Sequence, residues 1–322
     1  MRYWKSAIFK MKHAMFVLLF LVGKNIAAQR DTIQLNNNWQ FAIDKNGTGM
    51  VDKWYEQVLK NETTVQLPHT WNIETANQNH YGWGWYQKKL MAPTFWKHKS
   101  VRLMFGAVNH TAYIYLNGKK IDEHIGDGFN KFFVDLTGKL NYGKENIITV
   151  AVNNDYGKNK VPFGSSFDWP NDGGIIRKVA LIVTDRPSVS YIHATPKLEL
   201  LTSSGSLNLR LGFEELPSKN TRFAVVVSEE NQPTHEVILV KSINPEWLGK
   251  EGVVDIDIPK VNPWHFDHPN LYRVDVTVFN GAKASDKVSA TVGFRTIKMD
   301  KGKFYLNGEN IKLMGVEWTA GS

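Results

Sequence analysis

Residues 163–177 carry the most unusual set of chemically useful side chains in the sequence. Asp168 and Asp172 stand in an aromatic loop that runs into two adjacent glycines and then into an apolar stretch. Carboxylate oxygens accept hydrogen bonds from ligand hydroxyls, and glycine permits backbone conformations that other residues avoid. Two interpretations stay open at this point: a loop that binds a hydroxylated ligand, or a surface loop capped by solvated aspartates.

A second concentration of aromatic residues lies in Gly82-Trp-Gly-Trp-Tyr86. Exposed indole rings stack on the apolar faces of sugars, which favours a carbohydrate site. The alternative is that Trp85 and Tyr86 begin a buried core strand. The glycines do not form a dinucleotide fingerprint, because the third glycine and the βαβ context are missing.

The sequence lacks the residues that several classes of enzymatic reaction need. The chain has no cysteine, which excludes thiolate chemistry and disulfides. Its ten histidines are scattered without metal-ligand spacing, so we expect no metal and no cofactor. Trp264-His-Phe-Asp-His268 lies in a loop bounded by prolines, where a structural role is expected. No Gly-x-Ser-x-Gly elbow marks a serine hydrolase.

The elements that must position these residues are predicted to be β-strands. Short runs of alternating apolar residues recur along the chain, as in Ala112–Leu116 and Tyr272–Val278. Such alternation of β-branched and aromatic residues indicates half-buried strands. Asn117-Gly118 between two runs predicts a tight hairpin. A single short helix is expected at Val51–Lys60, and the fold class is all-β.

The strand pattern divides the body of the chain into two domains. A proline near residues 185–188 interrupts the pattern. We expect a jelly-roll sandwich at residues 29–185, because this part is longer and carries larger loops. The size and strand spacing of residues 186–296 suit an immunoglobulin-like β-sandwich without a disulfide.

The N-terminus has the pattern of a targeting segment. Four basic side chains precede the apolar run Ala14–Val22, and Ala27 and Ala28 offer a cleavage site. The run is too short to span a bilayer. We therefore predict a signal peptide at residues 1–28 and a secreted or periplasmic protein with no membrane span after cleavage; the alternative is an anchor helix.

The positive net charge belongs mainly to this leader. Residues 1–28 hold five basic side chains and no acidic one, so their removal changes 39 basic and 31 acidic residues to 34 and 31. Such a weak excess of positive charge gives little support to nucleic-acid binding. We expect no nucleic-acid partner.

A series of short motifs follows one order along most of residues 31–322. They are Leu67-Pro-His-Thr-Trp71, Trp85-Tyr86, Ala112-Tyr-Ile-Tyr-Leu-Asn-Gly118, Asp168-Trp, Gly174-Ile-Ile-Arg177, Trp264, Pro269-Asn-Leu-Tyr272, Gly293-Phe-Arg295, Phe304-Tyr-Leu-Asn-Gly308 and Met314-Gly-Val316. This order resembles the N-terminal half of glycoside hydrolase family 2, the group of β-galactosidases, β-glucuronidases and β-mannosidases. The resemblance implies a jelly-roll sugar-binding domain, an immunoglobulin-like domain and then a catalytic (β/α)8 barrel.

The resemblance also implies a retaining mechanism with two glutamates about 5 Å apart inside the barrel. A whole barrel needs about 250 residues, whereas residues 297–322 supply only its first hairpin and a strand at Ile311–Val316. Glu309 and Glu317 match neither catalytic position. We therefore predict the N-terminal part of a secreted β-glycosidase for β-linked glycosides, with no catalytic residue and no activity in this chain by itself.

One ligand contact can be carried over from the family. Its aspartate six residues before the Gly-Ile-x-Arg glycine contacts the sugar, and Asp168 stands six residues before Gly174. The resemblance thus makes Asp168 a substrate-binding residue and places Trp169 in the same pocket. Arg177 is expected to pair with a carboxylate and hold the turn. At Glu317 the sequence differs from the β-galactosidase pattern and is closer to that of β-mannosidase-like members. The motifs therefore do not identify the sugar.

Two hypotheses of other classes remain. One is a secreted carbohydrate-binding β-sandwich protein without catalytic function, which binds glycans through Trp83, Trp85 and Trp169. The other is a structural adhesion sandwich without sugar specificity. The hairpin after residue 297 favours the glycosidase hypothesis, because a finished binding protein has no need to begin a barrel.

Overall fold

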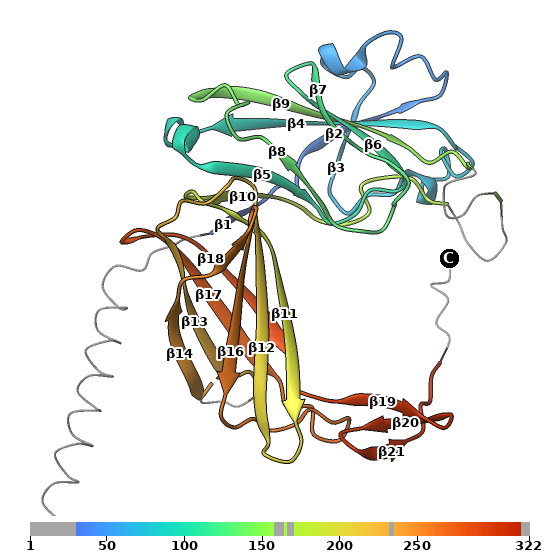
Figure 1. Ribbon diagram of the computed structural model, residues 1–322. Coiled ribbons are helices and arrows are strands. Elements are labelled where there is room, and N and C mark those ends of the chain that lie inside the picture. The colour runs from blue at the N-terminus through green and yellow to red at the C-terminus, as the bar shows by residue number, and fades with distance from the viewer. Residues whose placement is uncertain (1–29, 158–163, 166–170, 232–234, 317–322) are drawn as a thin grey trace, which may run out of the picture. The chain divides into compact units, whose positions relative to one another are not determined.

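Figure 1 shows the protein as a computed structural model in which residues 30–157, 164–165, 171–231 and 235–316 are described. Almost every regular element is a β-strand, as predicted. These residues form two compact units: an N-terminal unit at Asp31–Val183, and a C-terminal unit that comprises Thr184–Gly315 and Arg30. The expected signal peptide lies outside the described residues, and no helix within them is long and apolar enough to cross a membrane.

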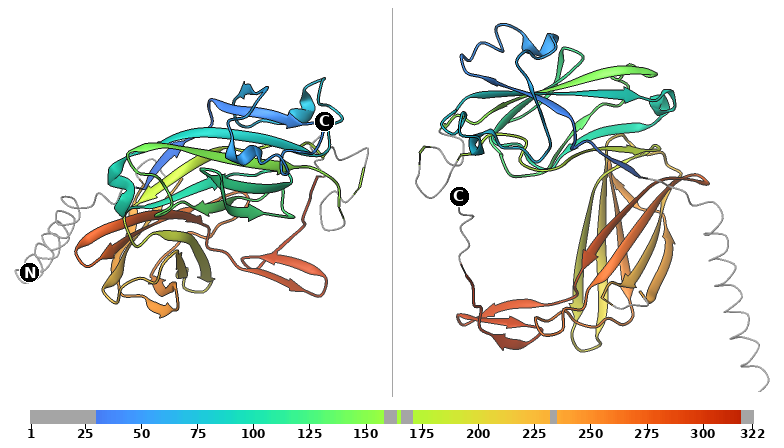
Figure 2. Two further views of the ribbon diagram at one scale, coloured as in Figure 1. Left: turned by 90° about the horizontal axis from the view of Figure 1, so that it is seen from above. Right: turned by 180° about the vertical axis from the view of Figure 1, so that it is seen from behind.

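The N-terminal unit is a sandwich of two sheets, which Figure 2 shows stacked face to face. The six-stranded sheet runs in the order β3 (Thr63–Val65), β2 (Trp39–Asp44), β4 (Trp83–Ala92), β9 (Lys144–Asn153), β6 (Thr111–Leu116) and β7 (Lys119–His124). The four-stranded sheet runs in the order β1 (Asp31–Gln34), β10 (Val179–Thr184), β5 (Ser100–Phe105) and β8 (Phe132–Asp135). Three short 3-10 helices occur in the connections: η1 (Trp54–Glu56), η2 (Trp71–Ile73) and η3 (Thr94–His98).

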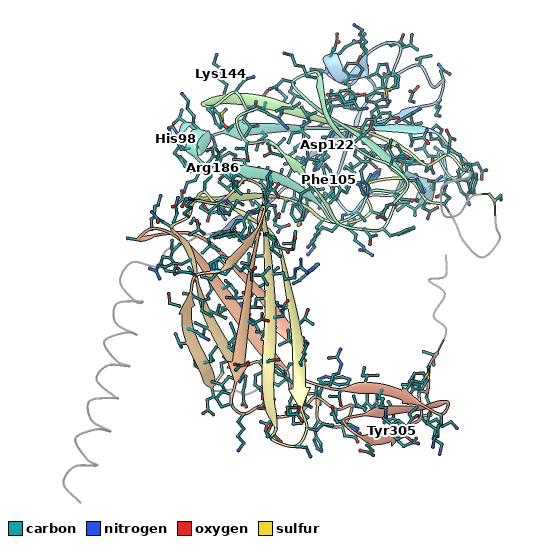
Figure 3. The ribbon with its side chains drawn as sticks, in the orientation of Figure 1. His98, Phe105, Asp122, Lys144, Arg186 and Tyr305 are labelled. Carbon is teal, nitrogen blue, oxygen red and sulfur yellow. The ribbon has the colours of Figure 1, made fainter. Side chains whose placement is uncertain are left out.

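Period-two alternation gives the six-stranded sheet two different faces. Ile114 of β6 packs into the core between the sheets, as does the fully buried Phe105 of β5, which is labelled in Figure 3. The neighbouring Tyr113 and Tyr115 point to the opposite, outer face and belong to a second, aromatic cluster. Both faces of this sheet therefore bury apolar surface, which is the main favourable term in folding.

Residues 45–61 cover part of the outer face, and the helix expected at Val51–Lys60 does not form. Only the single turn of η1 is present, and Lys53 before it has left-handed backbone angles of φ 51° and ψ 50°. Tyr55 of η1 instead stacks on Tyr115 with ring centroids 4.4 Å apart. Tertiary packing of aromatic rings has overridden a weak helical propensity.

Two Asn-Gly pairs form the tight turns that the sequence predicts. Asn117 and Gly118 have φ values of 51° and 80° between β6 and β7. Asn307 and Gly308 have φ values of 50° and 83°. Asparagine and glycine tolerate these left-handed conformations, which match the twist of paired strands.

The C-terminal unit is a sandwich of two four-stranded sheets, consistent with the predicted immunoglobulin-like class. One sheet runs in the order β11 (Val189–Glu199), β12 (Ser204–Phe213), β16 (Glu251–Ile258) and β15 (Glu246–Leu248). The other runs in the order β14 (Val237–Ile243), β13 (Thr221–Glu229), β17 (Tyr272–Asn280) and β18 (Lys283–Val292). Its core consists of aliphatic and aromatic side chains from both sheets.

A buried ion pair ties Arg30 into the C-terminal unit. The Nε and Nη2 groups of Arg30 donate to the two carboxylate oxygens of Asp286 at 2.9 Å and 2.5 Å. The Asp286 side chain is fully buried, and it also accepts a hydrogen bond from the Val189 backbone N–H at 2.8 Å. A buried carboxylate needs such partners, because removing it from water is expensive.

A small sheet of β19 (Ile297–Asp300), β20 (Lys303–Leu306) and β21 (Glu309–Ile311) lies at one end of this sandwich (Figure 1). The predicted hairpin is therefore present, but the strand expected at Ile311–Val316 extends no further than Ile311. A strand requires a backbone partner, and residues 312–316 pair with none of the described residues. Leu313 and Val316 are accordingly 57% and 93% exposed, as expected for apolar side chains without partners.

Candidate functional site

The described part of the loop that carries Asp168 begins again at Asn171. Asp168 and Trp169, the two substrate-binding residues expected from the sequence, lie outside the described residues. Asn171 follows Asp168 by three positions, so the groups that hold Asn171 determine where the loop rejoins the fold. The described residues that support this loop therefore begin at Asn171.

Three buried asparagines clamp this end of the loop. Asn154 Nδ2 donates to the Asn171 carbonyl at 2.8 Å, and Asn171 Nδ2 donates to the Asn154 carbonyl at 2.5 Å. Asn109 Nδ2 donates to Asn171 Oδ1 at 3.1 Å and to the Asp172 carbonyl at 2.7 Å. All three asparagines are at most 2% exposed. Because unpaired buried amides are costly, this network favours a single backbone path.

A fourth buried asparagine, Asn72, joins the clamp to the segment after Trp71. Its Oδ1 accepts from the Gly173 backbone N–H at 2.8 Å and from Asn154 Nδ2 at 3.2 Å. Its Nδ2 donates to the His80 carbonyl at 3.0 Å. One side chain thus holds the backbone on both sides of the site.

The two glycines after Asp172 are required by close packing. A Cβ on Gly173 would stand 2.0 Å from Cζ2 of Trp71, and a Cβ on Gly174 would stand 2.1 Å from the His69 carbonyl oxygen. The Trp71 N–H donates to the Gly173 carbonyl at 3.2 Å, and the His69 N–H donates to the Ile175 carbonyl at 2.9 Å. Two motifs that are remote in the sequence therefore form one packed unit.

His69 carries a chain of side-chain hydrogen bonds beside this contact. His69 Nε2 lies 3.3 Å from Glu74 Oε1, and His69 Nδ1 lies 2.8 Å from the Tyr86 hydroxyl. Burial lowers the pKa of His69, although the hydrogen bond to Glu74 acts to raise it. Burial also raises the pKa of the Tyr86 hydroxyl well above its usual range. The neutral imidazole then donates to Glu74 and accepts from Tyr86, whose oxygen accepts from the Ile175 N–H.

Two tyrosines and Asp172 present polar groups beside the clamp. The Tyr81 and Tyr156 ring centroids are 5.1 Å apart. A hydrogen bond with Tyr156 raises the pKa of Tyr81, with a smaller contribution from the charge of Asp172. Burial raises the pKa of the Asp172 carboxyl. Phenols both donate to and accept from the hydroxyls of a sugar, and a carboxylate accepts from them.

The tyrosine pair is the part of the site that the sequence did not reveal. Trp83 pairs with Asn153 in the ladder between β4 and β9, so Tyr81 and Tyr156 flank the same end of two neighbouring strands. β4 and β9 are far apart in the sequence, so a local pattern does not predict that they pair. The only signal in the sequence was that each tyrosine directly precedes a glycine.

Arg177 has a different partner from the expected one. Its Nη1 donates to the Phe129 carbonyl at 3.0 Å, and it pairs with no carboxylate among the residues that the structure describes. The loop after β7 supplies this carbonyl, and Arg177 is exposed. The arginine still fastens the segment after the two glycines, through a neutral acceptor.

The aromatic cluster at Gly82–Tyr86 belongs mainly to the core. Trp85 and Tyr86 are fully buried, which confirms the core-strand interpretation and removes Trp85 as a stacking surface for a sugar. Trp83 is half-buried and packs against Tyr113 with ring centroids 5.4 Å apart.

A metal centre is not assembled by the described residues, where no group of three or more histidine, aspartate or glutamate side chains is arranged to hold an ion. The loop at Trp264–His268 has the structural role that was expected. The Trp264 N–H donates to the Phe294 carbonyl at 2.8 Å, and the Trp264 carbonyl accepts from Asn307 Nδ2 at 2.9 Å.

Comparison with protein families assigns both units. The family model described as "Glycosyl hydrolases family 2, sugar binding domain" matches residues 33–185, and the model described as "Glycosyl hydrolases family 2" matches residues 188–295. The chain belongs to glycosyl hydrolase family 2. The clamp and the packed glycines thus lie in the part of the chain that matches the sugar-binding domain of family 2.

Curated relatives in glycosyl hydrolase family 2 are longer than this chain. A β-glucuronidase of Bacteroides fragilis is 29% identical over 330 residues, which cover 98% of this chain and 45% of the relative. A β-galactosidase of Thermoanaerobacterium thermosulfurigenes is 31% identical over 304 residues, which cover 89% of this chain and 40% of the relative. The chain spans less than half the length of these two relatives.

A solved family 2 structure has the same fold. The β-glucuronidase from Ruminococcus gnavus in complex with D-glucaro-δ-lactam matches with a TM-score of 0.74 and 21% sequence identity. The match covers 88% of this chain and 49% of that chain.

Proposed function

We propose that this family 2 chain is the N-terminal, non-catalytic part of a retaining β-glycosidase that acts on β-linked hexosides or hexuronides. In the whole protein, the N-terminal unit delivers Asp168 to the sugar, and two glutamates in a barrel outside this chain perform the chemistry. The relatives are named as β-glucuronidases and β-galactosidases, which supports this substrate class.

The asparagine clamp is the observation that carries the proposal. A carboxylate that contacts substrate must be held close to its productive position by surrounding groups. Asn171 stands three residues from Asp168, and its carbonyl and side chain are held by Asn154 and Asn109. A loop tip with only a solvation role has no need for so many buried amide contacts at its base.

The test is the substitution Asp168→Ala in the whole protein, measured with nitrophenyl β-galactoside, β-glucuronide and β-mannoside. We expect kcat/KM on the preferred substrate to fall by about 10- to 100-fold, the worth of one charge-assisted hydrogen bond. If Asp168 serves the ligand and not the fold, the midpoint of unfolding should stay within about 1 °C.

The matched control is Asp122→Ala, which removes a carboxylate of β7 that is labelled in Figure 3. This variant should keep the kinetic constants of the unmodified protein. Unchanged kinetics in Asp168→Ala would refute the assigned role.

The proposal also predicts that the isolated 322-residue chain releases no nitrophenol from these substrates. Its basis is that the family places both catalytic glutamates in the barrel. Turnover by the isolated chain at a rate near that of a whole family 2 enzyme would contradict it.

We further propose that the protein is exported through residues 1–28. Cleavage after Ala28 retains Arg30, which the C-terminal unit needs for its ion pair with Asp286. N-terminal sequencing of the secreted or periplasmic product should begin at Gln29. A product that is retained with an intact N-terminus would support the anchor-helix alternative instead.

A further inference from the structure

A polar hollow lies over β2 in the N-terminal unit. Its volume is about 420 Å³, within the range of small-molecule sites. Its lining comes from β2, from the first residue of β3, from the covering segment 45–61 and from the segment after η2. None of the clamp asparagines is among its lining residues.

Trp54 gives the hollow an aromatic wall. This half-buried indole lines the hollow, and its ring centroid lies 5.8 Å from that of Trp85 beneath it. Trp85 is fully buried, and Asp44 Oδ2 accepts from its indole N–H at 3.4 Å. Trp54 therefore rests on an immobile ring, so little conformational freedom is left to lose when a flat apolar ligand face packs on it.

Glu74 gives the hollow a carboxylate in a preset orientation. Asn77 Nδ2 donates to its Oε2 at 2.6 Å, and His69 Nε2 lies 3.3 Å from its Oε1. The side chain is 42% exposed. Each carboxylate oxygen has two lone-pair sites, so both oxygens retain an acceptor position for two neighbouring hydroxyls of one ligand.

Two further side chains supply both donors and acceptors. Asn46 and Asn61 line the hollow and are exposed, and the amide groups of both make no side-chain hydrogen bond with the described residues. A ligand hydroxyl donates and accepts at the same time, which an amide group matches.

The charge of the lining selects among hydroxylated ligands. Its acidic residues are Asp44 and Glu74, and its only basic residue is Lys45. Asp44 already accepts from the backbone N–H groups of Thr48 and Gly49, whereas the exposed Glu74 carboxylate faces the hollow. A uronate would place its own carboxylate near this charge, so a neutral sugar fits better.

We propose that the hollow over β2 is an accessory binding site for a neutral saccharide, in which Trp54 stacks on a pyranose ring and Glu74 accepts hydrogen bonds from its hydroxyls. The site performs no chemistry. It adds a second contact with a glycan that involves none of the clamp asparagines, and it does not depend on the proposed catalytic partnership with a barrel.

The experiment uses the full 322-residue chain with lactose, cellobiose, β-1,4-mannobiose and methyl β-D-glucuronide as probes. Saturation-transfer NMR and calorimetric titration measure binding. We expect saturable binding of at least one neutral disaccharide and weaker binding of the glucuronide. Trp54→Ala should weaken that binding by at least ~10-fold, and Glu74→Gln should weaken it several-fold.

The variants Asn61→Ala and Trp83→Ala complete the design. Asn61 is exposed, so its substitution weakens binding without disturbing the fold, even if Trp54→Ala destabilises the packing on Trp85. Trp83 is a half-buried tryptophan outside the hollow, and its substitution should leave binding unchanged. Absence of saturable binding with every neutral probe, or binding that survives in Glu74→Gln and Asn61→Ala, overturns the proposal.

Discussion

Asn154 and Asn171 each donate a side-chain amide hydrogen to the backbone carbonyl of the other, at 2.8 Å and 2.5 Å. Both side chains are almost fully buried. The exchange closes the base of the loop that carries Asp168, because it joins the end of β9 to the point where that loop returns. The same amide groups would face water in an open loop, so their burial is a sign of a fixed local structure.

Substitution of Asn171 should destabilise the N-terminal unit. Asn171→Ala leaves the Asn154 carbonyl without its donor and removes one of the two acceptors of Asn109 Nδ2. We expect a loss of about 2–3 kcal/mol in the free energy of unfolding, since each unsatisfied buried group costs about 1–3 kcal/mol. Urea denaturation measures the loss. The control Asn37→Ala, at an exposed asparagine, should change the value by less than about 0.5 kcal/mol, and equal midpoints for both variants would show that the clamp is not stabilising.

A methyl group at residue 173 should be poorly tolerated. The Cβ in Gly173→Ala would lie 2.0 Å from a ring atom of the fully buried Trp71. Overpacking of this kind costs about 1–3 kcal/mol or more, so we expect a lower thermal midpoint. Gly315→Ala is the matched control, because the methyl group that it adds would have no atom within 4 Å and the φ of Gly315 is ordinary. Equal midpoints would mean that the backbone at Gly173 moves freely away from Trp71.

Acid should weaken the N-terminal unit through His69. Burial holds the pKa of His69 below its ordinary value of 6.5, so the unfolded chain binds the proton more readily than the fold does. Stability is therefore unaffected above about pH 6.5 and falls as the pH drops below it, by no more than ~1.4 kcal/mol per pH unit for one proton. Denaturation at pH 7.5 and 5.5 should show a smaller difference for His69→Gln than for the unmodified protein.

The control for the histidine is His98→Gln at the exposed position labelled in Figure 3. It should keep the pH dependence of the unmodified chain. A pH dependence that is the same in all three proteins would contradict the buried, neutral state of His69.

Loss of Arg30 should destabilise the C-terminal unit. Arg30→Ala leaves the fully buried Asp286 carboxylate with only backbone donors from Val189 and Lys287. Removal of one partner of a buried pair costs about 3–5 kcal/mol. Arg186→Ala breaks a pair with Glu215 in which both side chains are more than 40% exposed, and should cost less than about 1 kcal/mol. Similar unfolding free energies for the two variants, measured in guanidinium chloride, would show that the Arg30 pair contributes little.

Local patterns were sufficient for the strands and their turns. The alternation around Ile114 separates a core face from an aromatic outer face, and Asn117-Gly118 forms its turn. The helix expected at Val51–Lys60 failed because Tyr55 finds a stacking partner in Tyr115, which stands on a different strand. A local pattern contains no information on such a partner.

The candidate site was predictable only in part. The order of the motifs was enough to recognise the family, whereas the role of Asp168, singled out by its spacing to Gly174, stays a prediction. The asparagine clamp could not be predicted, because nothing in the sequence distinguishes Asn72, Asn109 and Asn154 from ordinary polar surface residues. Arg177 was assigned a carboxylate partner, whereas the fold offers the Phe129 carbonyl.

The all-β class, the hairpins and the family follow from side-chain periodicity, turn residues and motif order, all of which can be read along the chain. Which polar residues become buried partners depends on how the chain folds in three dimensions. The exchange between Asn154 and Asn171, and the fit of Gly173 on Trp71, exist because sheet pairing brings distant segments within hydrogen-bond and van der Waals distance. Burial then makes those contacts obligatory, because an amide without a partner has no water to replace it.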